Sequence, residues 1–150
     1  MQNKRKQFAV LRAVGLAFAI ISWNIVAQSQ SQGRVYGTVY LNHRPVGNGD
    51  ARVFVLNSSQ GDSLESCLRN GSNFARCYFT AMGGDLLHGL PTDSGGHYSF
   101  TNEEADGTYW FVAVYKWGDM SSDNPIHALK FTAVQEGHEQ QLDLFMPGQP

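Results

Sequence analysis

Residues of the types that catalyse reactions or bind metals are thinly spread along this chain. Metal sites usually show themselves by close spacing of His, Cys, Asp and Glu, and the histidines here form no close pair. We therefore predict no metal and no cofactor, and we assign the imidazoles to the surface or to strand edges. The five histidines are His43, His88, His97, His127 and His138.

Asp93, Ser94 and His97 are close enough in sequence to suggest an acid, a nucleophile and a base. They fall in a glycine-containing turn, where Asp and Ser are favoured because their side chains hydrogen-bond to the nearby backbone. The strand-turn-helix surroundings of a hydrolase nucleophile are missing around Ser94. These residues therefore predict a turn, and we assign no catalytic residue.

Cys67 and Cys77 are the only two cysteines, with nine residues between them. On a chain bound for an oxidising compartment, this pair predicts a disulfide. Closing so short a loop stabilises a fold by roughly 2–3 kcal/mol. A metal site is the alternative, but neither cysteine has a second cysteine at CxxC spacing or a nearby histidine.

Residues 1–27 have the layout of a secretory signal peptide. Three basic residues at 4–6 precede an apolar stretch over 13–26, and the small residue Ala27 suits the cleavage site. We expect a signal helix that is removed, a flexible linker over 28–33, and a secreted, periplasmic or envelope-associated protein. The alternative is an uncleaved leader that anchors the chain in a membrane, which needs about 20 residues to span.

Removing this leader makes the chain acidic. Four of the eleven basic residues lie in the leader and all thirteen acidic residues lie beyond it, so seven remain against thirteen and the net charge is −6. Nucleic-acid binding needs a basic surface to neutralise phosphates. The composition therefore excludes nucleic acid as a partner, and the remaining length suits one domain.

Beyond the leader, apolar residues alternate with polar ones and predict an all-β domain over residues 34–146, followed by a tail over 147–150. The predicted strands cover 34–41, 51–57, 97–101, 108–117, 126–134 and 139–146. Alternation also predicts the core between the layers, which consists of Val35, Gly37, Val39, Ala51, Val53, Val55, Tyr98, Phe100, Tyr109 and Phe111.

Residues 58–91 form a long excursion between the second and third main strands. A structureless loop of this length is uncommon in a compact domain, so we expect it to carry its own strand or hairpin. The prediction places this strand at Arg76 to Ala81, held by Cys77, with a turn at Gly83-Gly84.

The two-residue alternation of side chains along each strand places four large aromatic rings on the outer faces of the sheets: Tyr36, Tyr40, Phe54 and Trp110. An exposed aromatic surface with a polar rim stacks on sugar rings or docks on a partner protein. We predict these four rings as ligand-binding residues. The alternative is that the excursion over 58–91 folds back and covers them.

Four motifs together resemble the carboxypeptidase regulatory-like domains. They are Gly-x-Val-x-Gly-x-Val from Gly33, Ala-x-Val-x-Val from Ala51, Thr-Asp-x-x-Gly-x-Tyr-x-Phe from Thr92, and Gly-x-Tyr from Gly107. The resemblance implies a prealbumin-like (transthyretin-like) Greek-key β-sandwich of about seven strands. It also implies a scaffolding or recognition role, and several relatives of this kind bind carbohydrate.

Two enzyme families with related topology provide the alternative function. Transthyretin-related hydroxyisourate hydrolases end in Tyr-Arg-Gly-Ser, which this chain lacks. Intradiol dioxygenases bind iron through two tyrosines and a His-x-His pair, and the segment around His127 resembles the neighbourhood of that pair, with Leu129 in place of the second histidine. An iron site that lacks one ligand is a poor metal site.

The sequence therefore predicts a secreted, non-catalytic binding or scaffolding module. Its expected ligand is a carbohydrate or an envelope protein, and a membrane contact is expected only through an uncleaved leader. An enzyme with a degenerate site on the same scaffold remains the alternative.

Overall fold

A computed structural model of the chain describes residues 32–83, 89–102, 107–117 and 124–147. The predicted signal peptide, most of the predicted linker, His88, Gly84 and most of the tail lie outside these residues. Within the described ranges, no helix combines the length and the apolar character that crossing a membrane requires.

The first sheet is built around its central strand β1 (Gly33–Leu41). Along one edge of β1 run the antiparallel strands β5 (His97–Asn102) and β2 (Arg44–Pro45). Along the other edge run the parallel strands β8 (Glu139–Gln141) and β9 (Leu144–Met146). The first and last strands of the domain are therefore neighbours.

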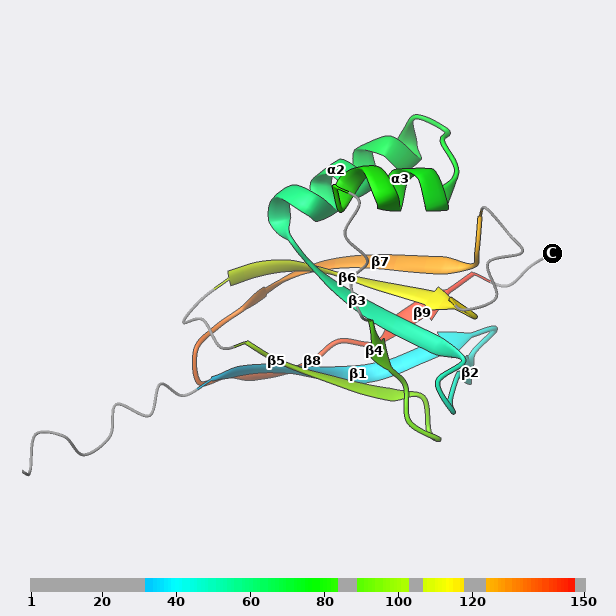
Figure 1. Cartoon of the computed structure of the whole chain (residues 1–150). Coiled ribbons are helices and arrows are strands. Elements are labelled where there is room, and N and C mark those ends of the chain that lie inside the picture. Colours follow the sequence, from blue (N-terminus) through cyan, green and yellow to red (C-terminus); the bar gives the residue numbers. More distant parts are fainter. Residues whose placement is uncertain (1–31, 84–88, 103–106, 118–123, 148–150) are drawn as a thin grey trace, which may run out of the picture.

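The second sheet has the strand order β4-β3-β6-β7, with all neighbours antiparallel. Its strands are β4 (Leu90–Pro91), β3 (Ala51–Asn57), β6 (Gly107–Tyr115) and β7 (His127–Val134). Figure 1 shows the two sheets facing each other. The prediction of a mainly β domain with two facing sheets is confirmed.

The core between the sheets follows the predicted alternation. Val35, Val39, Ala51, Val53 and Phe111 are fully buried in it. Three other predicted core residues are partly buried and pack against its edge: Val55, Phe100 and Tyr109. Period two along each strand is thus sufficient to predict which side chains fill the space between the layers.

The excursion holds two helices, and the predicted strand at Arg76 to Ala81 is wrong. Helix α2 (Ser58–Arg69) and helix α3 (Phe74–Ala81) lie over the outer face of the second sheet (Figure 1). Asn57 caps α2 in a capping box. Its side chain accepts a hydrogen bond from the Gln60 backbone N–H, and the Gln60 side chain accepts one from the Asn57 backbone N–H. The apolar side chains recur at helical spacing, which is why a helix forms here.

The helices bury a second apolar cluster against the second sheet. The sheet contributes Phe54, Leu56, Val112 and Val114, and the helices contribute Leu64, Phe74, Cys77 and Tyr78. The described residues therefore form three layers, in which the second sheet is covered on both faces and the first sheet on one.

The Cys67–Cys77 disulfide joins α2 to α3, with a Cα–Cα distance of 5.5 Å. This bond confirms the predicted pairing. It ties together the two helices that cover the second sheet, and it is typical of an oxidising compartment.

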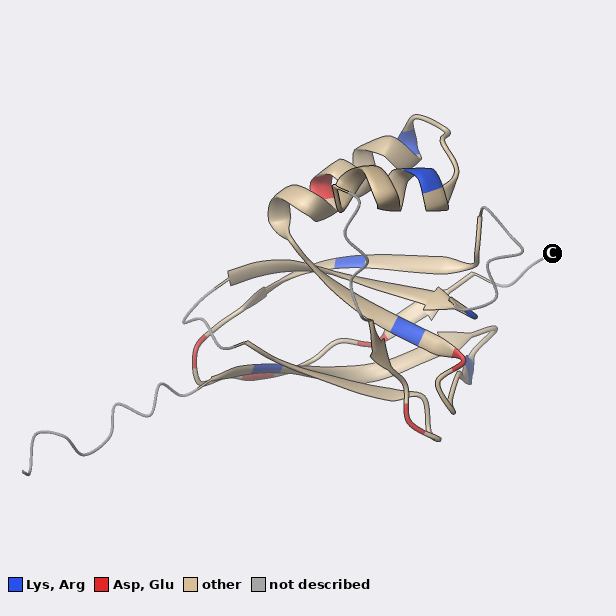
Figure 2. Ribbon diagram, viewed as in Figure 1, with Lys and Arg blue, Asp and Glu red and all other residues tan. Residues whose placement is uncertain are grey.

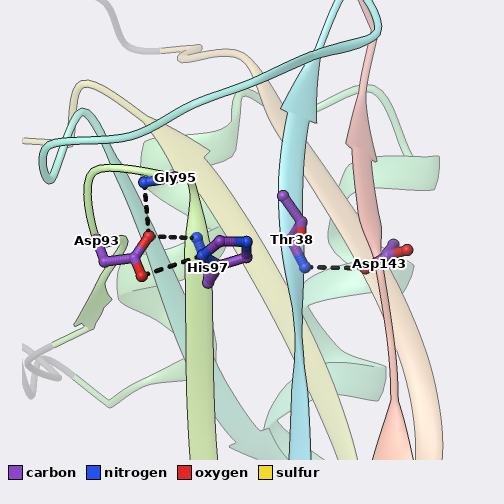
Figure 3. Close-up of polar contacts among 5 residues, drawn as sticks. All are labelled: Thr38, Asp93, Gly95, His97 and Asp143. Carbon is purple, nitrogen blue, oxygen red and sulfur yellow. Dashed lines mark hydrogen bonds and ion pairs between the residues drawn. The ribbon is translucent and has the colours of Figure 1, made fainter.

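The predicted last strand, 139–146, is interrupted. Its two halves, β8 and β9, are separated at Leu142 and Asp143, where the Leu142 carbonyl oxygen lies 2.0 Å from the position that a Cβ on Gly37 would occupy. The Thr38 backbone N–H therefore donates to the Asp143 side chain, at 2.9 Å, in place of a regular ladder bond (Figure 3). With this break and the short β2 and β4, the described residues contain nine strands, where about seven were expected.

Candidate functional site

The structure separates the four predicted ligand-binding rings into two pairs on different sheets. Phe54 is not on the surface: it is 1 % exposed, and its ring centroid lies 5.3 Å from that of Tyr78 and 4.8 Å from that of Trp117. Trp110 is partly buried, and its indole N–H donates to Asp62 of α2 at 2.9 Å. The predicted exposure is therefore wrong for Phe54, which the helices cover, and Trp110 is partly covered by them.

Tyr36 and Tyr40 alternate along β1 with the buried Val35 and Val39, so their side chains lie on the outer face of the first sheet. The Tyr36 side chain is 37 % exposed. Tyr40 is partly exposed and stacks on Phe145 of β9, with ring centroids 4.9 Å apart and planes 8° from parallel. We call the outward side chains of β1, β5, β8 and β9 the open face.

Tyr36 lies at the centre of a ring of polar side chains on this open face. Its register partners on the two neighbouring strands are Ser99 of β5 and Gln141 of β8. Next to them, Arg34 donates from Nε to Ser99 Oγ at 3.0 Å and lies 3.5 Å from Glu139 through Nη1. The Arg34 Cζ atom is 5.8 Å from the Tyr36 ring centroid, so the guanidinium is held beside the ring.

The surface around these residues is hollowed. A shallow cavity of about 650 Å³ is bordered by both neighbouring strands and by the turn before β5. Its lining residues include Arg34, Tyr36, Asp93, His97, Ser99 and Glu139. A flat ring, a cation and two carboxylates thus border one concave surface.

Asp93 organises the turn that forms one rim of this cavity (Figure 3). Its Oδ1 atom accepts hydrogen bonds from the backbone N–H groups of Gly95, at 2.8 Å, and His97, at 2.9 Å. Its Oδ2 atom lies 3.1 Å from Nδ1 of His97. These hydrogen bonds hold the pKa of Asp93 below its ordinary value, and the bond from the His97 backbone N–H has the largest effect. The carboxylate is a turn-stabilising group that also fixes the His97 imidazole on the rim.

The interruption between β8 and β9 is supported from inside the sandwich by Tyr98. The Tyr98 hydroxyl donates to the Leu142 carbonyl at 2.5 Å. Burial, with a smaller contribution from the Asp143 charge, raises the pKa of Tyr98, so the hydroxyl stays protonated and remains a donor. The positions of Gln141 and Asp143 on the open face follow from this support.

Two further histidines, His127 and His138, are engaged in local contacts. His127 lies 2.8 Å from the Pro125 carbonyl through Nδ1, and its ring packs on Phe74 at 4.4 Å between centroids. His138 makes a similar contact with the Glu136 carbonyl, also at 2.8 Å. In the described ranges, no three His, Cys, Asp or Glu side chains gather closely enough to hold a metal ion.

Arg34, Glu139 and Phe145 were not predicted as site residues. Alternation within 139–146 does indicate that Phe145 points away from the buried Leu144 and Met146. That it stacks on Tyr40, and that Glu139 lies beside Arg34, depends on the parallel pairing of β8 and β9 with β1, which joins residues 105 positions apart. No local signal in the sequence specifies that pairing.

Comparison with known proteins adds no relative from which a function can be transferred. No protein-family model matches the chain, and no curated protein matches it. The open face around Tyr36 is therefore the feature from which a function has to be inferred.

Proposed function

We propose that this chain is a secreted, non-catalytic binding module that holds a carbohydrate on its open face, with Tyr36 as the central contact. The observation that carries the proposal is the arrangement at Tyr36. An exposed aromatic ring lies in a shallow cavity and is bordered by charged, hydroxyl and amide side chains from three adjacent strands.

A sugar ring has the chemistry that this surface complements. Its C–H groups form an apolar face that packs on a flat aromatic ring, and its hydroxyls both donate and accept hydrogen bonds at the edge. Around Tyr36, Arg34 offers donors, Glu139 offers acceptors, and Ser99 and Gln141 offer both. The hydrogen bonds between Arg34 and its neighbours hold the guanidinium in place before any ligand arrives, which lowers the entropy cost of binding.

The fold and the compartment belong to the same proposal. The motif Thr-Asp-x-x-Gly-x-Tyr-x-Phe forms the Asp93 turn and strand β5, as a carboxypeptidase regulatory-like domain of the prealbumin-like type would use it. The disulfide between Cys67 and Cys77 and the signal-like residues 1–27 support secretion to the periplasm, envelope or medium.

The non-catalytic part of the proposal is supported by what Asp93 and His97 do. The Asp93 carboxylate accepts its hydrogen bonds from the turn that contains it, so both residues have a structural explanation. The aromatic packing of His127 on Phe74 likewise explains that histidine. Stoichiometric iron or zinc in the purified protein, measured by elemental analysis, would contradict this part and favour the enzyme alternative.

Titration calorimetry of the mature protein against a panel of neutral oligosaccharides tests the binding proposal. Tyr36→Ala is expected to weaken binding about tenfold or more, since loss of an aromatic stack together with its apolar area costs about 1–3 kcal/mol. The matched control is Phe131→Ala, which removes a ring that is 49 % exposed on the second sheet. This control is expected to leave the affinity unchanged.

Two results would reject a carbohydrate ligand at this site. One is the absence of heat with every oligosaccharide in the panel, which would leave an envelope protein as the partner to be sought. The other is equal loss of affinity in the Tyr36 and Phe131 variants, because a general change in the protein would then explain both.

A further inference from the structure

The open face carries a second aromatic position besides Tyr36. Phe145 is 58 % exposed, the most exposed of the large apolar side chains in the described ranges, and it stacks on Tyr40. The stacking fixes the Phe145 ring although most of it is in solvent. A fixed, exposed ring on the same face as Tyr36 is a second surface on which an apolar ligand face can pack.

The two aromatic positions lie along one strand. Tyr36 and Tyr40 are four residues apart on β1, and both point outward because side chains alternate along a strand. At a rise of about 3.3 Å per residue, their separation along β1 is about 13 Å. Register places Phe145 directly beside Tyr40. One monosaccharide therefore cannot cover both positions, whereas a linear oligosaccharide lying along β1 can.

The surface between the two positions is polar. Thr38 is buried there, and its backbone N–H donates to Asp143 (Figure 3). The Asp143 carboxylate also accepts from the Gln141 amide at 3.2 Å. Asp143 thus lies where the hydroxyls between two stacked sugar rings would need hydrogen-bond partners, and Gln141 lies next to it, beside Tyr36.

The charges on this face favour a neutral chain over an acidic one. Arg34 lies next to Glu139, His97 lies next to Asp93, and Asp143 adds a further negative charge. Figure 2 shows that Lys and Arg are scattered over the described residues and form no cluster on the first sheet. A polyanion would gain no electrostatic attraction from such a surface.

We infer that the ligand is a neutral, linear oligosaccharide that spans two stacking positions along β1, one at Tyr36 and one at Phe145. This inference rests on the proposed function and adds its substrate class and the second contact. It predicts that affinity depends on chain length, because only a chain long enough to reach both rings gains the second stack.

The test compares a disaccharide with the hexasaccharide of the same neutral series, using cello-, manno-, xylo- and chito-oligosaccharides as probes in calorimetry. The hexasaccharide is expected to bind about tenfold more tightly or better. Phe145→Ala is expected to remove this difference while the disaccharide affinity stays within twofold of the native value. Tyr36→Ala is expected to weaken both probes, and an oligogalacturonate of equal length is expected to bind more weakly than the neutral hexamer.

The outcomes separate the inference from the proposed function. Tyr36-dependent binding with equal affinities for the disaccharide and hexasaccharide would overturn the second stacking position and leave the function standing. A hexasaccharide affinity that Phe145→Ala leaves unchanged would likewise overturn the second stacking position and leave the function standing. Tighter binding of the oligogalacturonate would overturn the neutral ligand, and no binding of any probe would reject the function together with the inference. Because Phe145 is largely exposed, circular dichroism of the variant is expected to match that of the native protein.

Discussion

The outer faces of the two sheets differ in what lies against them. On the second sheet, the outward side chains Phe54, Leu56, Val112 and Val114 are buried beneath α2 and α3. On the first sheet, the outward residues of β1 include the exposed Arg34 and Tyr36. Helices α2 and α3 lie on the other side of the second sheet from β1 (Figure 1). Both sheets share one core, so the difference originates in the residues on their outer sides.

A strand that is apolar on both faces requires a layer on each side. Strand β6 is such a strand, since Val112 and Val114 face the helices while Phe111 and Ala113 face the other sheet. Strand β1 instead alternates buried valines with Arg34, Tyr36 and Tyr40. A surface that mixes charged groups with aromatic rings is stable in water without a covering layer. The second sheet is thus buried on both faces, and the first sheet carries the face on which we propose that a ligand binds.

The sharpest test of this division compares two phenylalanines. Phe54→Ala is expected to reduce the free energy of unfolding by about 3–5 kcal/mol, because it leaves a cavity between β3 and α3. Phe145→Ala is expected to change it by no more than about 0.5 kcal/mol, because that ring is largely exposed. Urea unfolding of the two variants measures both values, and similar losses would show that the open face is part of the stabilising core.

Reduction of the disulfide tests the cover of the second sheet. Opening the Cys67–Cys77 loop is expected to cost roughly 2–3 kcal/mol through the entropy of the unfolded chain. Because α2 and α3 contact the second sheet, Trp110 and Trp117 fluorescence is expected to shift when the helices loosen, whereas sugar binding at Tyr36 is expected to be retained under native conditions. Loss of binding on reduction, with the strands intact, would show that the two faces are coupled.

Gly61 tests how closely α2 has to approach the sheet. A Cβ at this position would lie 1.9 Å from the Trp110 ring, so Gly61→Ala is expected to destabilise the protein by about 1–3 kcal/mol. The sign of this stability change is informative, because replacing glycine by alanine inside a helix normally stabilises the helix by about 0.5–1 kcal/mol. Ser63→Ala, at an exposed position of the same helix, is the control for that propensity gain. A more stable Gly61 variant would contradict the close packing on Trp110.

The strands of this fold and their inner faces were predictable from local pattern. Val35 and Val53 were placed in the core because alternation is a property of a few neighbouring residues. The helices were missed although Asn57 with Gln60 forms a capping box and the spacing of Phe74, Cys77 and Tyr78 is helical. The apolar run at 76–81 is so short that its pattern fits a strand as well as a helix. Its composition is typical of a strand, and this led to the wrong prediction of a strand.

The candidate site was predictable only in part, for a different physical reason. Tyr36 and Tyr40 were placed outward correctly by period two, but that period does not show which outer face receives a cover. Phe54 and Trp110 satisfy the same rule and are buried or partly buried by the helices. Glu139 and Phe145 reach the site through long-range parallel pairing with β1, and such pairing is set by the whole fold.

Asp93→Asn tests the turn on the rim of the open face, and it has the smallest expected effect. The hydrogen bonds from His97 and Gly95 lower the Asp93 pKa from its ordinary value of 3.8, so the ionised carboxylate stabilises the folded state. That contribution is fully present above pH 3.8 and is lost as the pH falls through the lower pKa of the folded state. The asparagine variant is therefore expected to be slightly less stable than the native protein at neutral pH, and the difference is expected to shrink as the pH falls below 3.8.

Thermal unfolding of the native and Asp93→Asn proteins between neutral and strongly acidic pH measures this difference. Ser94→Ala, in the same exposed turn, is the control, since a serine hydroxyl does not titrate in this range and any effect is expected to be independent of pH. An effect of Asp93→Asn that stays constant with pH would mean that the shape of the turn, and not the charge on Asp93, holds His97 in place. Backbone geometry would then fix the side chains at this rim of the open face, whereas apolar burial fixes those on the outer face of the second sheet.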